Sequence, residues 1–155
     1  MMTDLDLALL TDGPVRLIDP AALAIVTAWL GGHGYQVGRV PAGDCATAAD
    51  LHSAVARGLE LPDHYGHNLD ALNDVLRSVA LAPGPGLVLV LDRYDAFAAR
   101  HRDTAQTVLD VFAAQARLGL LRGRRMLCLV QSDDPDLAFA PVGAAPVTWH
   151  RAAST

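Results

Sequence analysis

The sequence predicts an α/β fold, a small and mainly parallel sheet packed with helices. Two runs of apolar residues, Leu87–Leu91 and Met126–Val130, are typical of strands that a parallel sheet buries on both faces. Helical segments separate these runs from each other and from Tyr35–Val40, whose residues alternate like a strand, and such alternation of strands and helices is the pattern of α/β proteins. A length of 155 residues fits one domain, and a hydrophobic content of 52% excludes a wholly disordered chain.

The other elements follow from helical spacing and from residues that begin or end helices. Helices are predicted at Pro20–Leu30, Thr47–Leu59, Asn68–Val79 and Thr104–Leu118, and an edge strand is predicted at Val147–His150. Asp19 and Pro20 suit the cap and the first position of the first of these helices, and Gly31 and Gly32 follow its end. The segment Leu5–Leu10 is predicted to form a short strand or a helix.

Charge and composition exclude several classes of protein. The formal net charge is −5, from 12 basic and 17 acidic residues, whereas a protein that binds nucleic acid through phosphate contacts is normally basic. The apolar stretch Ala21–Leu30 is about half the length of a membrane span. The acidic start Met1–Asp6 differs from a basic signal peptide, which predicts a cytoplasmic protein, and Cys45 and Cys128 are predicted to be buried thiols. All twelve basic residues are arginine, which indicates the GC-rich genome of a bacterium.

The acidity is concentrated in one part of the chain. The window from Asp44 to Asp74 holds six acidic residues and one arginine, a local net charge of −5. In the helix predicted after Gly66, Asn68 is placed to cap the first turn. Helical spacing puts Leu69, Leu72, Leu76 and Val79 on one side, and Asp70, Asn73, Asp74 and Arg77 on the other.

Two interpretations of the polar side of this helix remain open at this point. It can be a solvated surface on which Asp74 pairs with Arg77. It can also be a rigid acidic surface that docks into a cationic pocket of a partner protein. Basic partners fit the charge of the chain better than DNA or RNA does.

A long motif of mixed residue types favours the second interpretation. It consists of a proline, a turn with an aromatic residue, a glycine, the run Asn-Leu-Asp-Ala-Leu and a further acid, here Pro62, Tyr65, Gly66, Asn68–Leu72 and Asp74. This motif resembles the signature of the barstar family of ribonuclease inhibitors. The resemblance extends to Asp50–His52, Leu87–Leu89 and Val108–Phe112, and it covers roughly residues 35–131.

The resemblance implies a barstar-like fold and an inhibitor that blocks a secreted, guanyl-specific bacterial ribonuclease inside the producing cell, as an immunity protein. In the family, the acidic helix and the loop before it enter the ribonuclease active site, where their carboxylates replace the RNA phosphate among arginine, lysine and histidine side chains. Asp74 matches the dominant binding aspartate and Asp70 its helper. The partner-binding residues implied here are Asp74, Asp70, His64, Asn73, Gly66, His67 and Tyr65. No cofactor is implied.

The sequence departs from the family pattern at three positions. His64 stands where the best-known members have a tyrosine, and Asn73 where they have a tryptophan. Ala114 stands where a peripheral glutamate lies. These changes keep the acidic centre of the motif and alter the residues around it.

The resemblance divides the chain into an N-terminal extension of residues 1–34, a barstar-like domain of residues 35–131 and a C-terminal extension of residues 132–155. The alternative function is a protein-binding module of the same fold that neutralises a toxin other than a ribonuclease or binds another basic partner. An enzyme with Asp70 or Asp74 as its acid or base is disfavoured, because solvated carboxylates are poorly tuned for proton transfer. A metal site at His64 and His67 is also disfavoured, since no further ligand is signalled.

Overall fold

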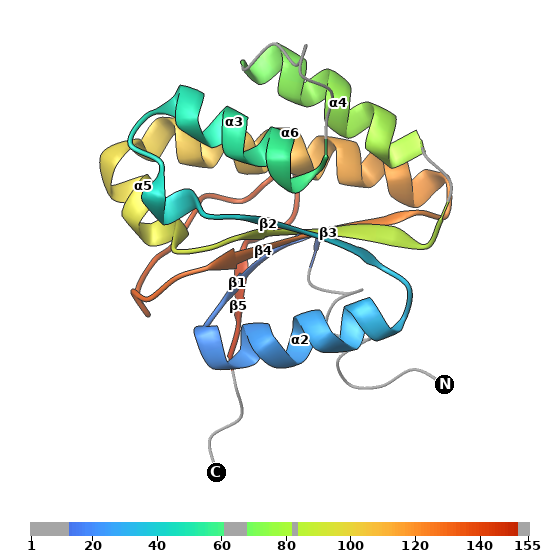
Figure 1. The fold of residues 1–155 in the computed structure, drawn as a ribbon, viewed down its shortest axis with the longest axis horizontal. Helices are drawn as coiled ribbons and strands as arrows, with labels where there is room; N and C mark the ends of the chain where they lie inside the picture. The colour runs from blue at the N-terminus through green and yellow to red at the C-terminus, as the bar shows by residue number, and fades with distance from the viewer. Residues whose placement is uncertain (1–12, 61–67, 82–83, 152–155) are drawn as a thin grey trace.

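A parallel sheet forms the centre of the molecule. The computed structural model describes residues 13–60, 68–81 and 84–151. Its strands are β1 (Val15–Ile18), β2 (Gln36–Val40), β3 (Gly86–Leu91), β4 (Arg125–Gln131) and β5 (Thr148–His150). They lie side by side in the order β2-β3-β4-β1-β5, and every pairing is parallel. The predicted α/β class with a mainly parallel sheet is therefore confirmed (Figure 1).

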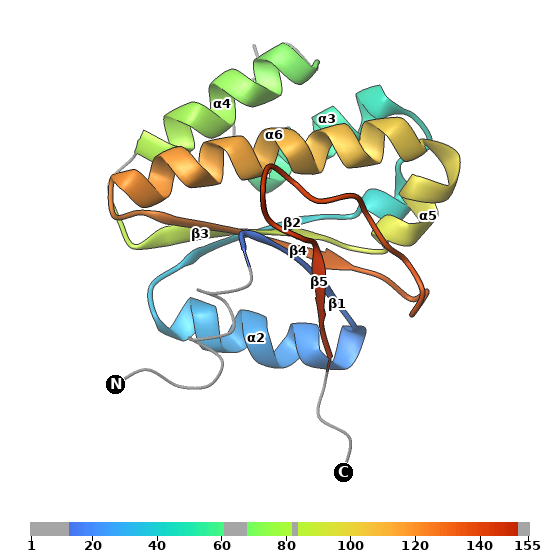
Figure 2. The same cartoon turned by 180° about the vertical axis from the view of Figure 1, so that it is seen from behind.

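The order of the strands places helices on both faces of the sheet. Parallel crossovers are right-handed as a rule, so a connection that runs across the sheet in the opposite direction crosses the opposite face. The step from β1 to β2 runs against the steps from β2 to β3 and β4, and its helix α2 (Pro20–Gly32) covers one face alone (Figures 1 and 2). The other face carries α3 (Ala48–Gly58), α4 (Leu69–Leu81), α5 (Tyr94–Arg100) and α6 (Arg102–Leu121).

Local capping begins the helices where the sequence predicts. The Asp19 carboxylate accepts a hydrogen bond of 2.7 Å from the amide of Ala22, with Pro20 in the first turn of α2. At the start of α3 the Thr47 hydroxyl and the Asp50 carboxylate form a reciprocal capping box, which satisfies two backbone N–H groups at once. A short 3₁₀ helix, η1 (Ala42–Asp44), leads from β2 toward α3.

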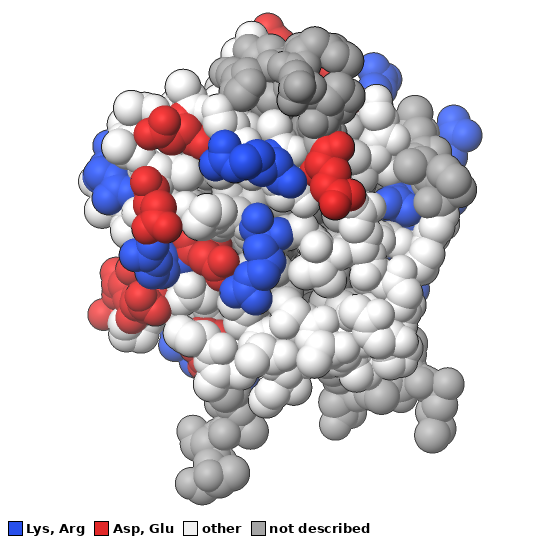
Figure 3. Space-filling view, viewed as in Figure 1, with Lys and Arg blue, Asp and Glu red and all other residues white. Residues whose placement is uncertain are grey.

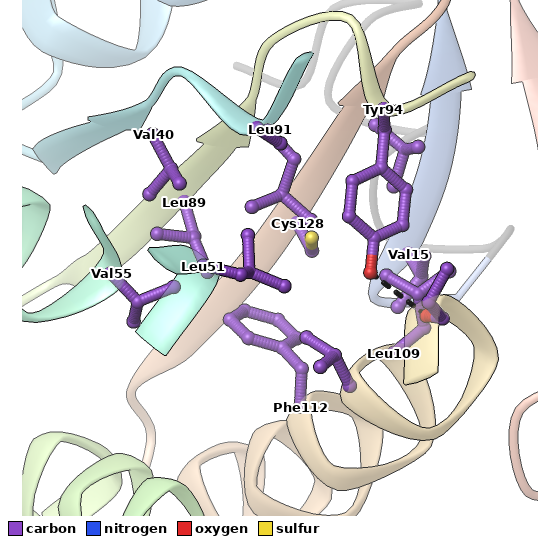
Figure 4. Packing of buried hydrophobic residues seen from close by; sticks show 14 of the residues in the cluster. Val15, Val40, Leu51, Val55, Leu89, Leu91, Tyr94, Leu109, Phe112 and Cys128 are labelled. Atoms are coloured by element: carbon purple, nitrogen blue, oxygen red, sulfur yellow. Dashed lines mark hydrogen bonds between the residues drawn. The ribbon is translucent and has the colours of Figure 1, made fainter. Parts of the chain in front are cut away.

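Side chains alternate across the sheet and build two cores. Leu87, Leu89 and Leu91 of β3 face the layer of four helices, and Val88 and Val90 face α2, as the period of two in a strand requires. All six residues of β3 are buried, which explains its unbroken apolar sequence. Figure 4 shows the larger core, where residues of β2, β3 and β4 meet residues of α3 and α6.

Both cysteines are buried and unpaired, as predicted. Burial raises the pKa of the Cys128 thiol. The pKa of the Cys45 thiol is also raised, mainly by burial and to a smaller extent by the nearby negative charge of Asp50. Because the thiolate is the reactive form, these two side chains act as small apolar groups at neutral pH. Among the helices described, none is both long and apolar enough to cross a membrane.

Three of the described elements were not predicted, namely β1, η1 and α5. The segment Leu5–Leu10 lies outside the described residues, and the first described strand is Val15–Ile18. Helix α5 is only seven residues long and has no side-chain cap, and it starts after Arg93, whose φ of 48° is left-handed. It forms because Tyr94 and Phe97 are buried and because the Tyr94 hydroxyl donates a hydrogen bond of 2.9 Å to the carbonyl of Ala105.

The two end segments supply strands to the same sheet as residues 35–131. Strand β1 pairs with β4 on one side and with β5 on the other, so it is an interior strand. The edge strand predicted at Val147–His150 is present as β5. The division into a barstar-like domain with two extensions stays a prediction; in the structure, Val15–Ile18 of the first extension pair within the same sheet, and α2 covers one of its faces.

Candidate partner-binding surface

Helix α4 lies on the outside of the helical layer, against α6 and away from the sheet (Figures 1 and 2). Its inner side buries Leu72, Leu76 and Ala80. Its first turn is held by Asn68, whose side-chain oxygen accepts a hydrogen bond of 2.8 Å from the amide of Ala71. The start and the rotation of α4 are thus fixed by a cap and by its packing, which orients its outer side chains.

Asp70 and Asp74 lie one turn apart on this helix, and both are exposed. Asp70 is in the first turn, where the positive end of the helix dipole favours a negative charge. Across the described residues, neither carboxylate forms an ion pair or accepts a hydrogen bond. The Ser78 hydroxyl does donate a hydrogen bond of 3.2 Å to Asp74, but to its backbone carbonyl and not to its carboxylate. The alternative pair of Asp74 with Arg77 is not formed.

Other acids of the same window have structural partners. The Asp44 carboxylate pairs with the Arg93 guanidinium, and the Asp50 carboxylate accepts from the amides of Ala46 and Thr47. Figure 3 shows the result: acidic and basic side chains alternate on the visible surface over α3 and the ends of β2 and β3. This neighbouring surface is balanced in charge, whereas the carboxylates of Asp70 and Asp74 are exposed and form no ion pair with a described residue.

Asn73 has a contact with α6 that helical spacing alone does not predict. It is half-buried at the boundary between α4 and α6, and its side-chain oxygen accepts a hydrogen bond of 2.8 Å from the side-chain nitrogen of Gln115. Asn73 is three residues after Asp70 and directly precedes Asp74 on α4, so it lies at the edge of their side of the helix, but its half-burial was not predicted. The reason is that α6 is 20 residues long and runs beneath this part of α4.

Gln115 is the residue that the sequence analysis missed. It lies on the same side of α6 as Val108, Phe112 and Ala116, which are buried in the core. A polar side chain in the middle of an apolar helix face needs a hydrogen-bond partner. That rule predicts a polar partner on a neighbouring element, but it does not say that the partner is Asn73.

The loop residues implied by the motif, His64, Tyr65, Gly66 and His67, lie outside the described residues. Ala114 is exposed on α6, next to Gln115.

Within the described ranges, no three histidine, cysteine, aspartate or glutamate side chains come together as metal ligands do.

Asp70 and Asp74 lie on an exposed surface of α4, outside the hollow between α6 and β4. This hollow of about 450 Å³ lies between α6, β4 and residues 142–146, and neither aspartate lines it. Exposed carboxylates of this kind can neutralise cationic groups of another molecule.

Comparison with known proteins agrees with this description. The model of the family described as Barstar (barnase inhibitor) matches residues 35–131. The matched range includes β2, β3 and β4, the four helices of one layer, and both Asp70 and Asp74. A comparison with curated proteins finds no match.

Proposed function

This chain belongs to the barstar family, and from that premise we propose that it inhibits a secreted, guanyl-specific bacterial ribonuclease. It acts as an immunity protein in the cytoplasm of the cell that makes the enzyme. Helix α4 and the loop before it, with His64, Tyr65, Gly66 and His67, plug the ribonuclease active site. The observation that carries the proposal is the pair of exposed carboxylates, Asp70 and Asp74, which have no partner among the described residues.

The chemistry of RNA cleavage explains why such a surface inhibits. A ribonuclease must hold a phosphate, and it does so with cationic side chains that form charge-assisted hydrogen bonds. A carboxylate presents the same negative charge and acceptor oxygens without a bond that can be cleaved. Since Asp70 and Asp74 give up no ion pair of their own on binding, the attraction to the cationic site is not offset by a lost contact within the described part of the inhibitor.

An inhibition assay tests the proposal directly. Purified guanyl-specific ribonucleases are titrated with the protein, and RNA cleavage is expected to fall to zero at a one-to-one ratio for the cognate enzyme. The Asp70→Ala/Asp74→Ala double variant is the matched control, because both side chains are exposed and their removal leaves the core of α4 intact. Full enzyme activity in the presence of excess protein, for every ribonuclease tested, would favour a toxin of another kind as the partner.

Association with the ribonuclease is expected to be fast and to slow as salt rises. Opposite charges steer the two proteins together over long distances, and salt screens this attraction over about 10 Å at 0.1 M ionic strength. Stopped-flow measurement of the association rate between about 0.02 and 0.5 M salt checks this. A rate that stays flat across the series would contradict an electrostatic mechanism.

His64 is expected to make binding sensitive to pH. A neutral imidazole can stack in the cleft as the family's tyrosine does, but a protonated one adds positive charge to a cationic site. Affinity is therefore expected to fall as pH drops below about 6.5, the ordinary histidine value. The His64→Tyr variant separates this effect from the titration of the partner's own histidines, and it should lose part of the pH dependence. Superimposable pH profiles of the two proteins would place His64 outside the interface.

A further inference from the structure

The contact between α4 and α6 determines which way the Asn73 amide faces. The Asn73 oxygen and the Gln115 nitrogen are 2.8 Å apart. Gln115 is only 9% exposed, and its own side-chain oxygen is buried without a hydrogen-bond partner among the described residues. A contact this short requires one donor and one acceptor, so the orientation of one amide determines that of the other.

The alternative orientation of the pair is less favourable. If both amides turned over, Asn73 would donate to the Gln115 oxygen, and the NH₂ group of Gln115 would occupy the buried position at which its oxygen now has no hydrogen-bond partner among the described residues. In the observed orientation only a carbonyl oxygen and one N–H lack a partner. Buried donors without a partner are rarer in proteins than buried carbonyl oxygens without one, so the observed orientation is the stable one.

The opposite end of the Asn73 amide then faces outward. Because the oxygen is directed at α6, the NH₂ group of the half-buried Asn73 lies on the other side of the amide carbon. No acceptor among the described residues takes its N–H groups. Asn73 directly precedes Asp74 and is three residues after Asp70, so α4 offers a neutral donor beside two carboxylates.

We propose that Gln115 is a positioning residue, which holds Asn73 so that its NH₂ group donates to an acceptor oxygen on the partner. This rests on the proposed function and adds a specificity determinant to it. The partner that fits is a ribonuclease whose cleft has a main-chain carbonyl or a carboxylate oxygen next to the cationic groups that receive Asp70 and Asp74. A ribonuclease with a further cation at that position would be selected against, because the N–H groups of Asn73 would meet like charge.

Three variants test the role of the contact. In Asn73→Asp, the side chain still accepts from Gln115 but turns a carboxylate oxygen outward. In Gln115→Glu, the new carboxylate can only accept, so the Asn73 amide turns over and presents its oxygen to the partner. In Gln115→Leu, the contact is lost and Asn73 is free to adopt either orientation. The control for added negative charge is Gln36→Glu, on the exposed residue at the start of β2.

The expected result is a graded loss of affinity for the cognate ribonuclease. Asn73→Asp and Gln115→Glu should each weaken binding by about tenfold or more, which is typical of an unpaired or repelled polar group in an interface. Gln115→Leu should weaken it by about two- to fivefold, since the correct orientation is still populated. Gln36→Glu should leave it within about twofold of wild type. Tighter binding by Asn73→Asp would overturn the proposal, because it would place a cation opposite residue 73.

Nuclear magnetic resonance of the free protein tests the orientation without any partner. The side-chain NH₂ protons of Gln115 should exchange slowly with water, and those of Asn73 should exchange fast. Gln115→Glu should reverse the protection of the Asn73 protons while backbone resonances of the core stay unchanged. Slow exchange at Asn73 in the free wild-type protein would contradict the inference.

The two sets of measurements separate this inference from the proposed function. If wild type binds a ribonuclease, Asp74→Ala does not, and all three variants at residues 73 and 115 bind like wild type, the inference fails and the function stands. If no ribonuclease binds but the exchange pattern is as expected, the function fails and only the orientation of Asn73 is supported.

Discussion

Replacing Asp74 by alanine should weaken binding to the cognate ribonuclease by about 30-fold or more, corresponding to about 2 kcal/mol or more. The removed carboxylate leaves cationic groups of the partner desolvated and unpaired. The figure of about 2 kcal/mol is a general one for buried charge pairs in interfaces, and it includes measurements on a ribonuclease–inhibitor pair of this family. Asp74 is exposed and has no side-chain partner in the described structure, so the free energy of unfolding should change little. Calorimetric titration and urea unfolding measure the two effects separately.

The matched control is Asp110→Ala. Asp110 is also an exposed aspartate in a helix, and its carboxylate has one side-chain contact, with Gln106 at 3.3 Å. Both variants raise the net charge by one, so a general effect of charge would weaken binding equally. We expect the loss at Asp74 alone, and equal losses would remove Asp74 from the centre of the interface.

Replacing Phe112 by alanine should lower the free energy of unfolding by about 3–5 kcal/mol. Phe112 is 1% exposed and packs between α6, α3 and the sheet, close to Leu51 and Cys128 (Figure 4). Removal of its ring deletes buried apolar contacts and leaves a cavity that the surrounding strands and helices fill only partly. Urea or thermal unfolding measures the loss.

Leu121→Ala is the control on the same helix. Leu121 is 80% exposed at the end of α6, so its truncation should change stability by no more than about 0.5 kcal/mol. Because α4 packs on α6, the Phe112→Ala protein should bind the ribonuclease only to the extent that it is folded. A stability close to wild type would show that Phe112 is not a central residue of the core.

The sequence alone determined the elements whose signals are local. Asp19 and Asn68 cap the helices that they were expected to cap, and the unbroken apolar run of β3 identified a strand buried on both faces. These signals work because a cap involves neighbouring residues only and because the period of burial is set by the geometry of the element itself. The family motif is local for the same reason, since it spans only residues 62–74.

The tertiary structure decided what depends on distant residues. Strand β1 is four residues long, and it is a strand because β4 and β5 pair with both of its sides. Helix α5 has no cap and forms because Tyr94 and Phe97 enter the core.

The same holds for the binding surface. Helical spacing put Asn73 beside Asp70 and Asp74, but only the packing of α4 on α6 brings its oxygen to Gln115, 42 residues away in the chain. A count of acids in the sequence cannot separate Asp44 and Asp50, which have structural partners, from Asp70 and Asp74, which have none in the described structure. Hydrogen bonds and ion pairs between distant segments depend on where the chain places them in space. The composition of the acidic segment therefore predicted a basic partner, whereas the fold decided which carboxylates are engaged within the described part of the chain and which are not.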